Sequence, residues 1–137
     1  MSQPAITGSE QVLSVERVFR ALADPTRVRI LNLLVEGPLC VGDLVAVLRV
    51  PQPTASRHLA YLRKSGLVHD ERRGPWSFYR LAPASPGFHE KVLDALQAAV
   101  TKQTRVDEAA LRGLRRVGGC CPQHSRPQGR ANGRRRS

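Results

Sequence analysis

The sequence from residue 51 to residue 66, Pro-Gln-Pro-Thr-Ala-Ser-Arg-His-Leu-Ala-Tyr-Leu-Arg-Lys-Ser-Gly, decides the fold of the chain. Its two prolines stop any preceding helix, but proline is well tolerated in the first turn of a new one. The apolar side chains that follow recur at helical spacing, and Gly66 suits the left-handed position that closes a helix. The stretch therefore predicts a helix that begins near Pro51 and ends near Ser65.

The two sides of this predicted helix differ in chemistry. Ala55, Leu59 and Leu62 share one side and are suited to burial. The polar and cationic side chains of the first two turns are Gln52, Thr54, Ser56, Arg57 and His58. Arginine forms paired hydrogen bonds with guanine, glutamine does so with adenine, and serine or threonine pairs with several acceptors. We therefore expect this helix to contact base edges in the major groove of DNA, rather than to be an ordinary solvated face.

The residues before this stretch predict three shorter helices. Asp24 and Pro25 mark the start of the second, because aspartate caps a helix and proline suits its first position. Gly37-Pro38 ends it. The apolar positions at helical spacing are Val12, Val15, Phe19 and Leu22 in the first helix, Val28, Leu31, Leu34 and Val35 in the second, and Val41, Leu44, Val45 and Leu48 in the third. The third helix and the one after Pro51 form a helix-turn-helix pattern.

The residues after Gly66 change to the pattern of extended chain. Leu67-Val68 opens one run, residues 76–81 form the other, and Gly74-Pro75 turns between them, which predicts a β-hairpin. Arg72 and Arg73 lie just before the turn, where they could reach phosphates or a narrow minor groove. Trp76 and Tyr79 are better suited to packing than to stacking on bases, because duplex DNA offers few unstacked bases to a hairpin.

The remainder of the chain predicts helix and then tail. A linker over residues 83–87 precedes a long amphipathic helix, and a weaker helix follows it to about Val117. The apolar positions are Phe88, Val92, Leu96 and Val100 in the long helix, and Leu111 and Leu114 in the weaker one. The predicted organisation is a disordered N-terminus over 1–8, one domain over 9–117, and a tail over 118–137 whose composition cannot bury a core. The fold class is mostly α with a β-hairpin wing, a dimeric winged helix-turn-helix in the order α-α-α-α-β-β-α.

The charge of the chain favours a polyanionic partner. The formal net charge is +11, and about +6 remains when the five arginines after Cys121 are set aside. Such a balance suits nucleic acid or an anionic membrane surface. The sequence has no apolar run of about 20 residues that could span a membrane and no secretory signal pattern. We therefore expect a cytoplasmic protein without a membrane partner, whose thiols stay reduced and serve as ligands or sensors before disulfides.

Three segments resemble the ArsR/SmtB family of metal-responsive repressors. Residues 21–31, Ala-Leu-Ala-Asp-Pro-Thr-Arg-Val-Arg-Ile-Leu, look like the opening of that family's domain, residues 52–59 resemble its recognition helix, and residues 76–81 resemble its second wing strand. The resemblance spans about residues 11–103. It implies a transcriptional repressor that binds double-stranded operator DNA as a homodimer built from the first and the long fifth helix. Pro51 departs from the family, which often has serine there, and proline cannot cap the recognition helix with a side chain.

The cysteines suggest what such a repressor senses. Residues 39–44 resemble the metal-binding box of the arsenical repressors, although Gly42 stands where the family has a second cysteine. Cys120 and Cys121 are adjacent in the tail, where a packing role is implausible and a disulfide between neighbours would be strained. Together with Cys40 they supply three sulfurs, the number that a trivalent arsenic or antimony centre requires. We therefore predict As(III) or Sb(III) as the inducer, bound by Cys40, Cys120 and Cys121.

Two alternatives stay open at this point. With His124, the three cysteines would make a tetrahedral set for Zn(II), or a related set for Cd(II) or Pb(II). A thiol-redox sensor on the same fold is the other alternative. The family's second type of metal site lies on the long helix, where His89 and Asp94 make no convincing set of four ligands, and His89 is expected at the surface. The sequence has no Gly-rich phosphate loop and no Ser-His-Asp or Cys-His spacing, so we do not expect an enzyme.

Overall fold

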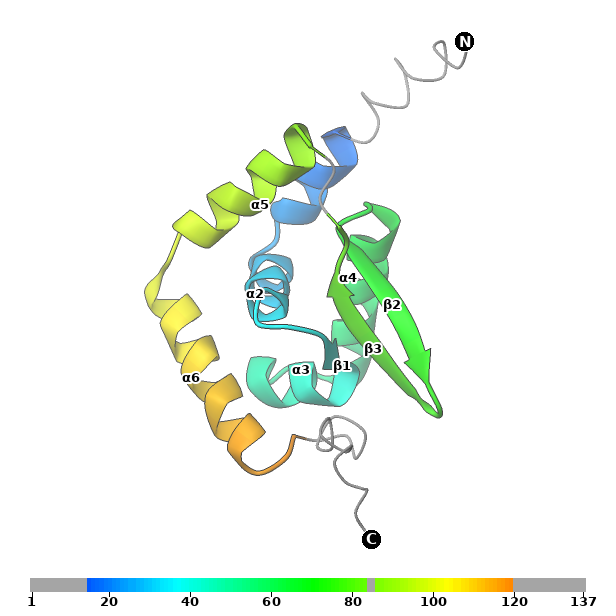
Figure 1. The fold of residues 1–137 in the computed structure, drawn as a ribbon, viewed down its shortest axis with the longest axis vertical. Coiled ribbons are helices and arrows are strands. Elements are labelled where there is room, and N and C mark those ends of the chain that lie inside the picture. The colour runs from blue at the N-terminus through cyan, green and yellow to red at the C-terminus, as the bar shows by residue number, and fades with distance from the viewer. Residues whose placement is uncertain (1–14, 84–85, 120–137) are drawn as a thin grey trace, which may run out of the picture.

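The structure is a computed structural model, and it describes residues 15–83 and 86–119 of the chain. A helix described over residues 15–22, here called the N-terminal helix, comes first. The elements that follow are α2 (Pro25–Leu34), β1 (Leu39–Cys40), α3 (Val41–Leu48), α4 (Gln52–Lys64), β2 (Val68–Arg73), β3 (Trp76–Leu81), α5 (Phe88–Ala98) and α6 (Lys102–Arg116). Figure 1 shows α2 in the middle of the ring that the other elements form. No helix in the described ranges is long and apolar enough to cross a membrane.

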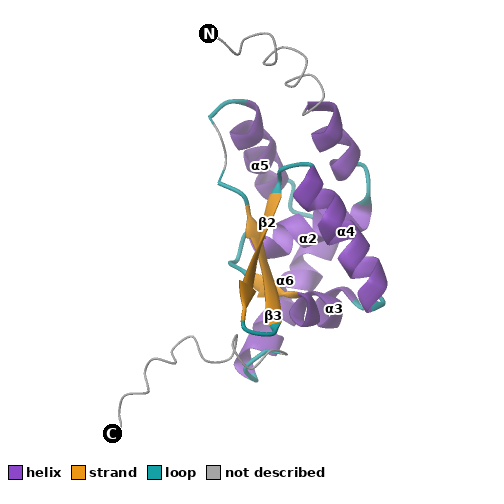
Figure 2. Ribbon diagram, turned by 90° about the vertical axis from the view of Figure 1, so that its right-hand side faces the viewer, coloured by secondary structure: helices purple, strands orange, loops and turns teal. Residues whose placement is uncertain are grey.

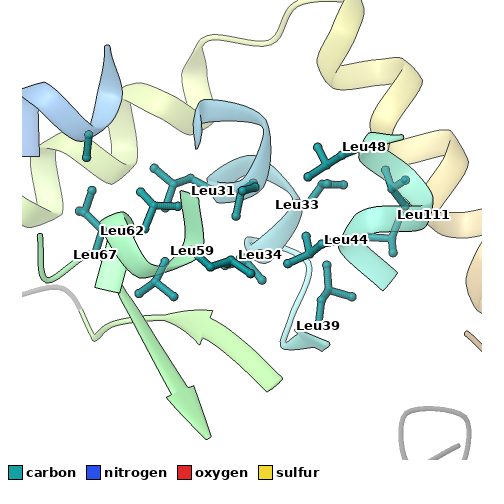
Figure 3. Packing of buried hydrophobic residues seen from close by; sticks show 14 of the residues in the cluster. Leu31, Leu33, Leu34, Leu39, Leu44, Leu48, Leu59, Leu62, Leu67 and Leu111 are labelled. Atoms are coloured by element: carbon teal, nitrogen blue, oxygen red, sulfur yellow. The ribbon is translucent and has the colours of Figure 1, made fainter. Parts of the chain in front are cut away.

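The core is built mainly from leucines around α2. Its fully buried side chains come from several helices and loops that converge there (Figure 3), and they include Leu31, Leu33, Leu34, Leu39, Leu44, Leu59, Leu62, Leu67 and Leu111. The predicted inner sides of the third and fourth helices are confirmed by the buried Leu44, Leu48, Leu59 and Leu62. In the second helix Leu31 and Leu34 are buried as predicted, but Val35 lies beyond the end of α2 and is 40% exposed. Leu111 shows that α6 also contributes to the core, since it packs where α2 and α3 meet.

The predicted start of α2 is confirmed at the level of atoms. Oδ1 of Asp24 accepts hydrogen bonds from the backbone N–H groups of Thr26 at 2.8 Å and Arg27 at 3.2 Å, and Pro25 occupies the first turn. Burial alone would raise the pKa of Asp24, but the hydrogen bonds from Arg27 and Thr26 stabilise the carboxylate and lower the pKa overall. The cap therefore contributes stability at neutral pH that is lost as the pH falls through this lowered pKa.

The hairpin is confirmed, and the structure adds a third strand. The strand order is β1-β3-β2, and both pairs are antiparallel. Gly74 makes the turn with a φ of 62°. Trp76 and Tyr79 are half-buried and pack against core residues, as predicted. The added strand β1 pairs Cys40 with Phe78, which links the start of α3 directly to the wing. Two residues after a Gly-Pro turn are too short a run to predict a strand from its pattern.

The C-terminal helices differ from the prediction in extent. The long helix was expected to include Val100, but α5 ends at Ala98, and Val100 is 51% exposed outside it. The expected weaker helix is a complete element, α6. Its start is set by a reciprocal cap in which the backbone N–H of Thr104 donates to the Thr101 side chain, while the Thr101 N–H donates to Oγ1 of Thr104. This cap gives α6 a start of its own, so two helices follow the hairpin where the predicted order α-α-α-α-β-β-α has one.

A buried ion pair holds α6 to α2. Nε of Arg29 lies 2.9 Å from Oδ2 of Asp107, and Nη2 of Arg29 donates to Oδ1 at 2.9 Å. Gln103 donates a third hydrogen bond to the carboxylate at 2.9 Å. Asp107 is 2% exposed, so its charge is compensated almost wholly by these donors. The hydrogen bond with Asp107 raises the pKa of the Arg29 guanidinium.

We predict that Arg29→Ala destabilises the protein by about 3 kcal/mol, because it leaves the Asp107 carboxylate buried without its cation. The free energy of unfolding in urea measures this loss. The double variant Arg29→Ala, Asp107→Ala should be less destabilised than the sum of its single variants, since it leaves no unpaired charge. Arg112→Ala, an exposed substitution on the same helix, serves as the control. Equal unfolding curves for Arg29→Ala and Arg112→Ala would contradict the prediction.

Candidate nucleic-acid interface

The helix α4 packs against the core through one side and exposes its other side to solvent. Ala55, Leu59 and Leu62 are fully buried, as predicted. The helix begins at Gln52 without any side-chain cap, and the carbonyl of Pro51 accepts the N–H groups of Thr54 and Ala55 at 3.0 and 3.1 Å. The unusual proline therefore still permits a regular helix start, because its backbone oxygen closes the first turn.

The predicted DNA-contacting side chains of α4 differ in exposure. Gln52 and Arg57 are exposed, whereas Thr54, Ser56 and His58 are half-buried. Nε2 of Gln52 lies 3.4 Å from Oγ of Ser56, one helical turn away, so these two side chains share one face. The arrangement brings a possible adenine-reading amide and a hydroxyl together at the N-terminal end of α4.

His58 also has a contact within the protein. Nη1 of Arg27 lies 3.2 Å from Nδ1 of His58. Because a guanidinium can only donate hydrogen bonds, Nδ1 must accept, which assigns the ring proton of neutral His58 to Nε2. Nε2–H then remains as the donor for an outside acceptor. The sequence interpretation missed Arg27, although its place within the motif of residues 21–31 was a signal.

The wing arginines lie on adjoining positions but have different surroundings. Arg73 contacts Glu71 at 3.3 Å, and its guanidinium stacks 4.6 Å from the centre of the Phe78 ring. Arg72 is exposed and forms no ion pair with any described residue. In Figure 2 the hairpin extends beside the helical layer, and β2 packs against α4. The wing thus offers one cation that is fully available and one that is partly engaged.

Cys40 lies at a junction of three elements. It is the N-cap of α3, where its Sγ accepts the N–H of Asp43 at 3.4 Å, and it pairs with Phe78 across β1 and β3. The residue is 1% exposed, and its sulfur is disulfide-bonded. Cys120, Cys121 and His124 lie outside the described residues. Within the described ranges, no group of three His, Cys, Asp or Glu side chains could hold a metal ion.

A cavity of about 350 Å³ adjoins Cys40. It connects the start of α3, the start of α4 and the tip of the wing, where the hairpin turns. Its lining residues are Cys40, Val41, Gly42, Gln52, Pro75, Trp76 and Ser77. A predicted sensing residue and a predicted DNA-contacting residue, Gln52, therefore share one space. The expectation that His89 lies at the surface was wrong, since the residue is half-buried and its Nε2 is enclosed, whereas Asp94 on the same helix α5 is exposed.

Comparison with known proteins identifies the family. The family model described as bacterial regulatory protein, arsR family, matches residues 24–70. The arsenical resistance operon repressor of Escherichia coli K12 is 46% identical over 101 residues, which cover 73% of this chain and 84% of that protein. The chain belongs to the ArsR family.

Other ArsR-family relatives include an arsenic resistance regulator and the repressor SmtB. The arsenic resistance transcriptional regulator ArsR1 of Pseudomonas putida KT2440 is 44% identical over 84 residues, covering 61% of this chain and 66% of that protein. The transcriptional repressor SmtB of Mycobacterium tuberculosis H37Rv is 43% identical over 79 residues, covering 58% of each chain. The resemblance noted in the sequence is thus confirmed, and the chain is an ArsR-family transcriptional repressor.

Solved structures confirm the winged helix-turn-helix fold. The homodimeric winged helix-turn-helix DNA-binding domain of Mb0332 from Mycobacterium bovis superimposes with a TM-score of 0.58 at 29% identity, covering 80% of this chain and 93% of that one. HlyU from Vibrio cholerae has a TM-score of 0.57 at 28% identity, covering 64% and 92%. This family and fold are those of DNA-binding transcriptional regulators.

For this ArsR-family chain we predict unequal roles for the two wing arginines. Arg72→Ala should lower the slope of log binding constant against log salt by about 1, as expected for one lost phosphate contact. Arg73→Ala should lower it less, because Glu71 already compensates that cation. Binding to a random duplex at several salt concentrations measures both slopes. Equal slopes for wild type and Arg72→Ala would exclude a phosphate contact at Arg72.

Proposed function

We propose that this protein represses transcription by binding an inverted-repeat operator as a homodimer, and releases it when As(III) or Sb(III) binds to cysteine thiolates. The named arsenical resistance relatives support the ligand class. The exposed Gln52 and Arg57 on α4 support base contact, with Thr54, Ser56 and His58 beside them. Arg72 and Arg73 add phosphate contacts from the wing.

The surface of the N-terminal helix and α5 supports a dimer. Phe19 is 57% exposed and packs edge-on against Phe88, with ring centres 5.6 Å apart. No side chain of α5 is fully buried, although its pattern is amphipathic. A second copy would cover this apolar face, and the homodimeric Mb0332 domain shares the fold. Two-fold symmetry in the protein implies an operator with two inverted half-sites.

We predict that Arg57→Ala weakens operator binding by about 1–3 kcal/mol and relaxes the preference for the operator over random DNA, because it removes a base contact. Competition between operator and random duplexes at physiological salt measures the ratio. Arg105→Ala is the matched control, since it removes the same charge from an exposed position on α6. An unchanged ratio for Arg57→Ala would remove Arg57 from the base-contacting set.

The position of Cys40 carries the sensing part of the proposal. A ligand bound there acts on α3 through the N-cap, on β3 through strand pairing, and on Gln52 through the shared cavity. Of these, β3 belongs to the wing and Gln52 to α4, the two parts of the molecule proposed to contact DNA. A ligand that displaces Cys40 would therefore change the angle between α4 and the wing. Operator binding requires that this angle be fixed.

The disulfide at Cys40 must be reduced before this sulfur can bind a metalloid in the proposed mechanism. The other two sulfurs of the proposed set, Cys120 and Cys121, lie outside the described residues. A cellular dithiol, or two monothiols, supplies the two electrons and two protons that convert the disulfide into two thiols, and is itself oxidised to a disulfide. Three thiols then react with arsenous acid, so that three As–S bonds replace three As–O bonds and three waters leave. The tail over 118–137 would bring its two thiols to Cys40.

The ligand must favour the DNA-free conformation, because equal affinity for both conformations would shift nothing. An allosteric coupling of about 1–3 kcal/mol is typical and lowers operator affinity about 5- to 150-fold. Ordering the tail opposes this by about 1–2 kcal/mol for each backbone residue that becomes fixed. Three metalloid–sulfur bonds can offset that cost.

We predict that arsenite releases reduced wild-type protein from a fluorescent operator, whereas Cys40→Ser and the double variant Cys120→Ser, Cys121→Ser bind the operator but are not released. Fluorescence anisotropy during titration measures release. His124→Ala is the control and should respond to arsenite as the wild type does. Normal release of both cysteine variants would refute the three-sulfur site.

The same titration separates the alternatives. Antimonite should act like arsenite, since both elements form three bonds to sulfur. Release by Zn(II), Cd(II) or Pb(II) at lower concentration than by arsenite, abolished in His124→Ala, would replace the proposal with a divalent-metal repressor. Release by oxidant alone, and recovery on reduction, would replace it with a thiol-redox repressor.

A further inference from the structure

Two adjoining hollows lie along the outer side of α4. One, of about 340 Å³, is lined by Arg17, Arg20, Tyr61, Lys64 and Ser65. The other, of about 380 Å³, is lined by Arg27, Arg57, His58, Ala60, Tyr61 and Lys64. They share Tyr61 and Lys64, and no acidic residue of the described chain lines either of them. We call them together the α4 basic surface.

The cations of the α4 basic surface differ in availability. Arg20 contacts Glu16 at 2.8 Å on the N-terminal helix, so its charge is partly compensated. Arg17, Arg57 and Lys64 are exposed and form no ion pair with any described residue. Three uncompensated cations around shared hollows attract an anion with several charges in a row.

Arg27 holds the two walls of this surface together. From α2, it donates to the carbonyls of Arg20 at 3.1 Å and Ala21 at 2.8 Å, at the end of the N-terminal helix. The same guanidinium contacts His58 and lies 4.2 Å from the centre of the Tyr61 ring, both on α4. The N-terminal helix and α4 are therefore fixed relative to each other before any partner binds, which lowers the entropic cost of binding.

We propose that the α4 basic surface binds backbone phosphates of the operator duplex between its two half-sites. The inference rests on the proposed function. Arg57 connects this surface to the DNA-contacting face of α4, so one duplex can reach both. In Figure 1 the N-terminal helix lies beside the end of α4, whereas the tip of the hairpin points to the opposite end of the molecule. The wing therefore contacts the outer flank of a half-site, and the α4 basic surface contacts its inner flank.

The dimer places the α4 basic surface on the inner flank of each half-site. The N-terminal helix is one of the two elements proposed to meet the second copy, so this end of α4 lies toward the two-fold axis. Each half-site is then held by phosphates on both sides, with α4 between them. Phosphate contacts of this kind fix the register of a protein on the duplex and add affinity without sequence preference.

The test uses the double variant Arg17→Ala, Lys64→Ala, which spares the predicted base-contacting residues. We expect the slope of log binding constant against log salt to fall by about 2, for operator and random duplex alike, with the ratio of the two affinities unchanged. Arg105→Ala, Arg112→Ala removes the same charge from exposed positions on α6 and should keep the wild-type slope. Arg17→Lys, Lys64→Arg should also keep it, because the charges remain.

Phosphate ethylation interference locates the contacts. In wild type, ethylation should interfere between the half-sites as well as on their outer flanks. In the double alanine variant, only the interference between the half-sites should disappear. An unchanged slope, or loss of interference on the outer flanks instead, would overturn the inference. If the wild type shows no operator preference, the proposed function fails, and the slope on random duplex still tests the surface by itself.

Discussion

The burial of one side of α4 is the constraint on which the other features depend. Ala55, Leu59 and Leu62 are fully enclosed by the core around α2. Removing a buried leucine side chain typically costs about 2–5 kcal/mol, a large share of the 5–15 kcal/mol that stabilises a domain of this size. Since the helix cannot rotate about its axis without exposing these side chains, the direction in which Gln52 and Arg57 project is set by the core and not by DNA.

The central helix α2 holds the neighbouring elements in place through two arginines. Arg27 and Arg29 are two residues apart, and residues at that spacing project to different sides of a helix. Arg27 ties α4 to the end of the N-terminal helix, whereas Arg29 ties α6 to the core through Asp107. Through these two arginines, α2 contacts α4, the end of the N-terminal helix and α6. The helix proposed to contact DNA, part of the proposed dimer surface and the last described helix are therefore all positioned against α2. A change at any of them is resisted by α2.

The short distance between sensing and DNA contact has a mechanistic consequence. Cys40 and Gln52 line one cavity, and Cys40 pairs directly with the wing strand. Coupling between an inducer at Cys40 and the operator therefore needs no long chain of intermediate residues. The proposed inner phosphate contacts oppose release from the operator, since they hold the C-terminal end of α4 against the duplex. In the proposed mechanism, a ligand that displaces the start of α4 would have to overcome these phosphate contacts near its end.

The sequence by itself determined the local structure and the chemical character of this protein. Prolines, glycines and Asp24 set where helices start and stop, because these residues restrict or cap the backbone within a few positions of themselves. Helical spacing separated Leu59 and Leu62 from Arg57, since it depends only on residues one or two turns apart. Tertiary structure alone decided the pairing of Arg29 with Asp107, 78 residues away, and that of Arg27 with His58, 31 residues away. It also decided that β1 pairs with the wing. Such contacts depend on how whole elements pack, and no pattern along the chain encodes which of many arginines meets which distant acceptor.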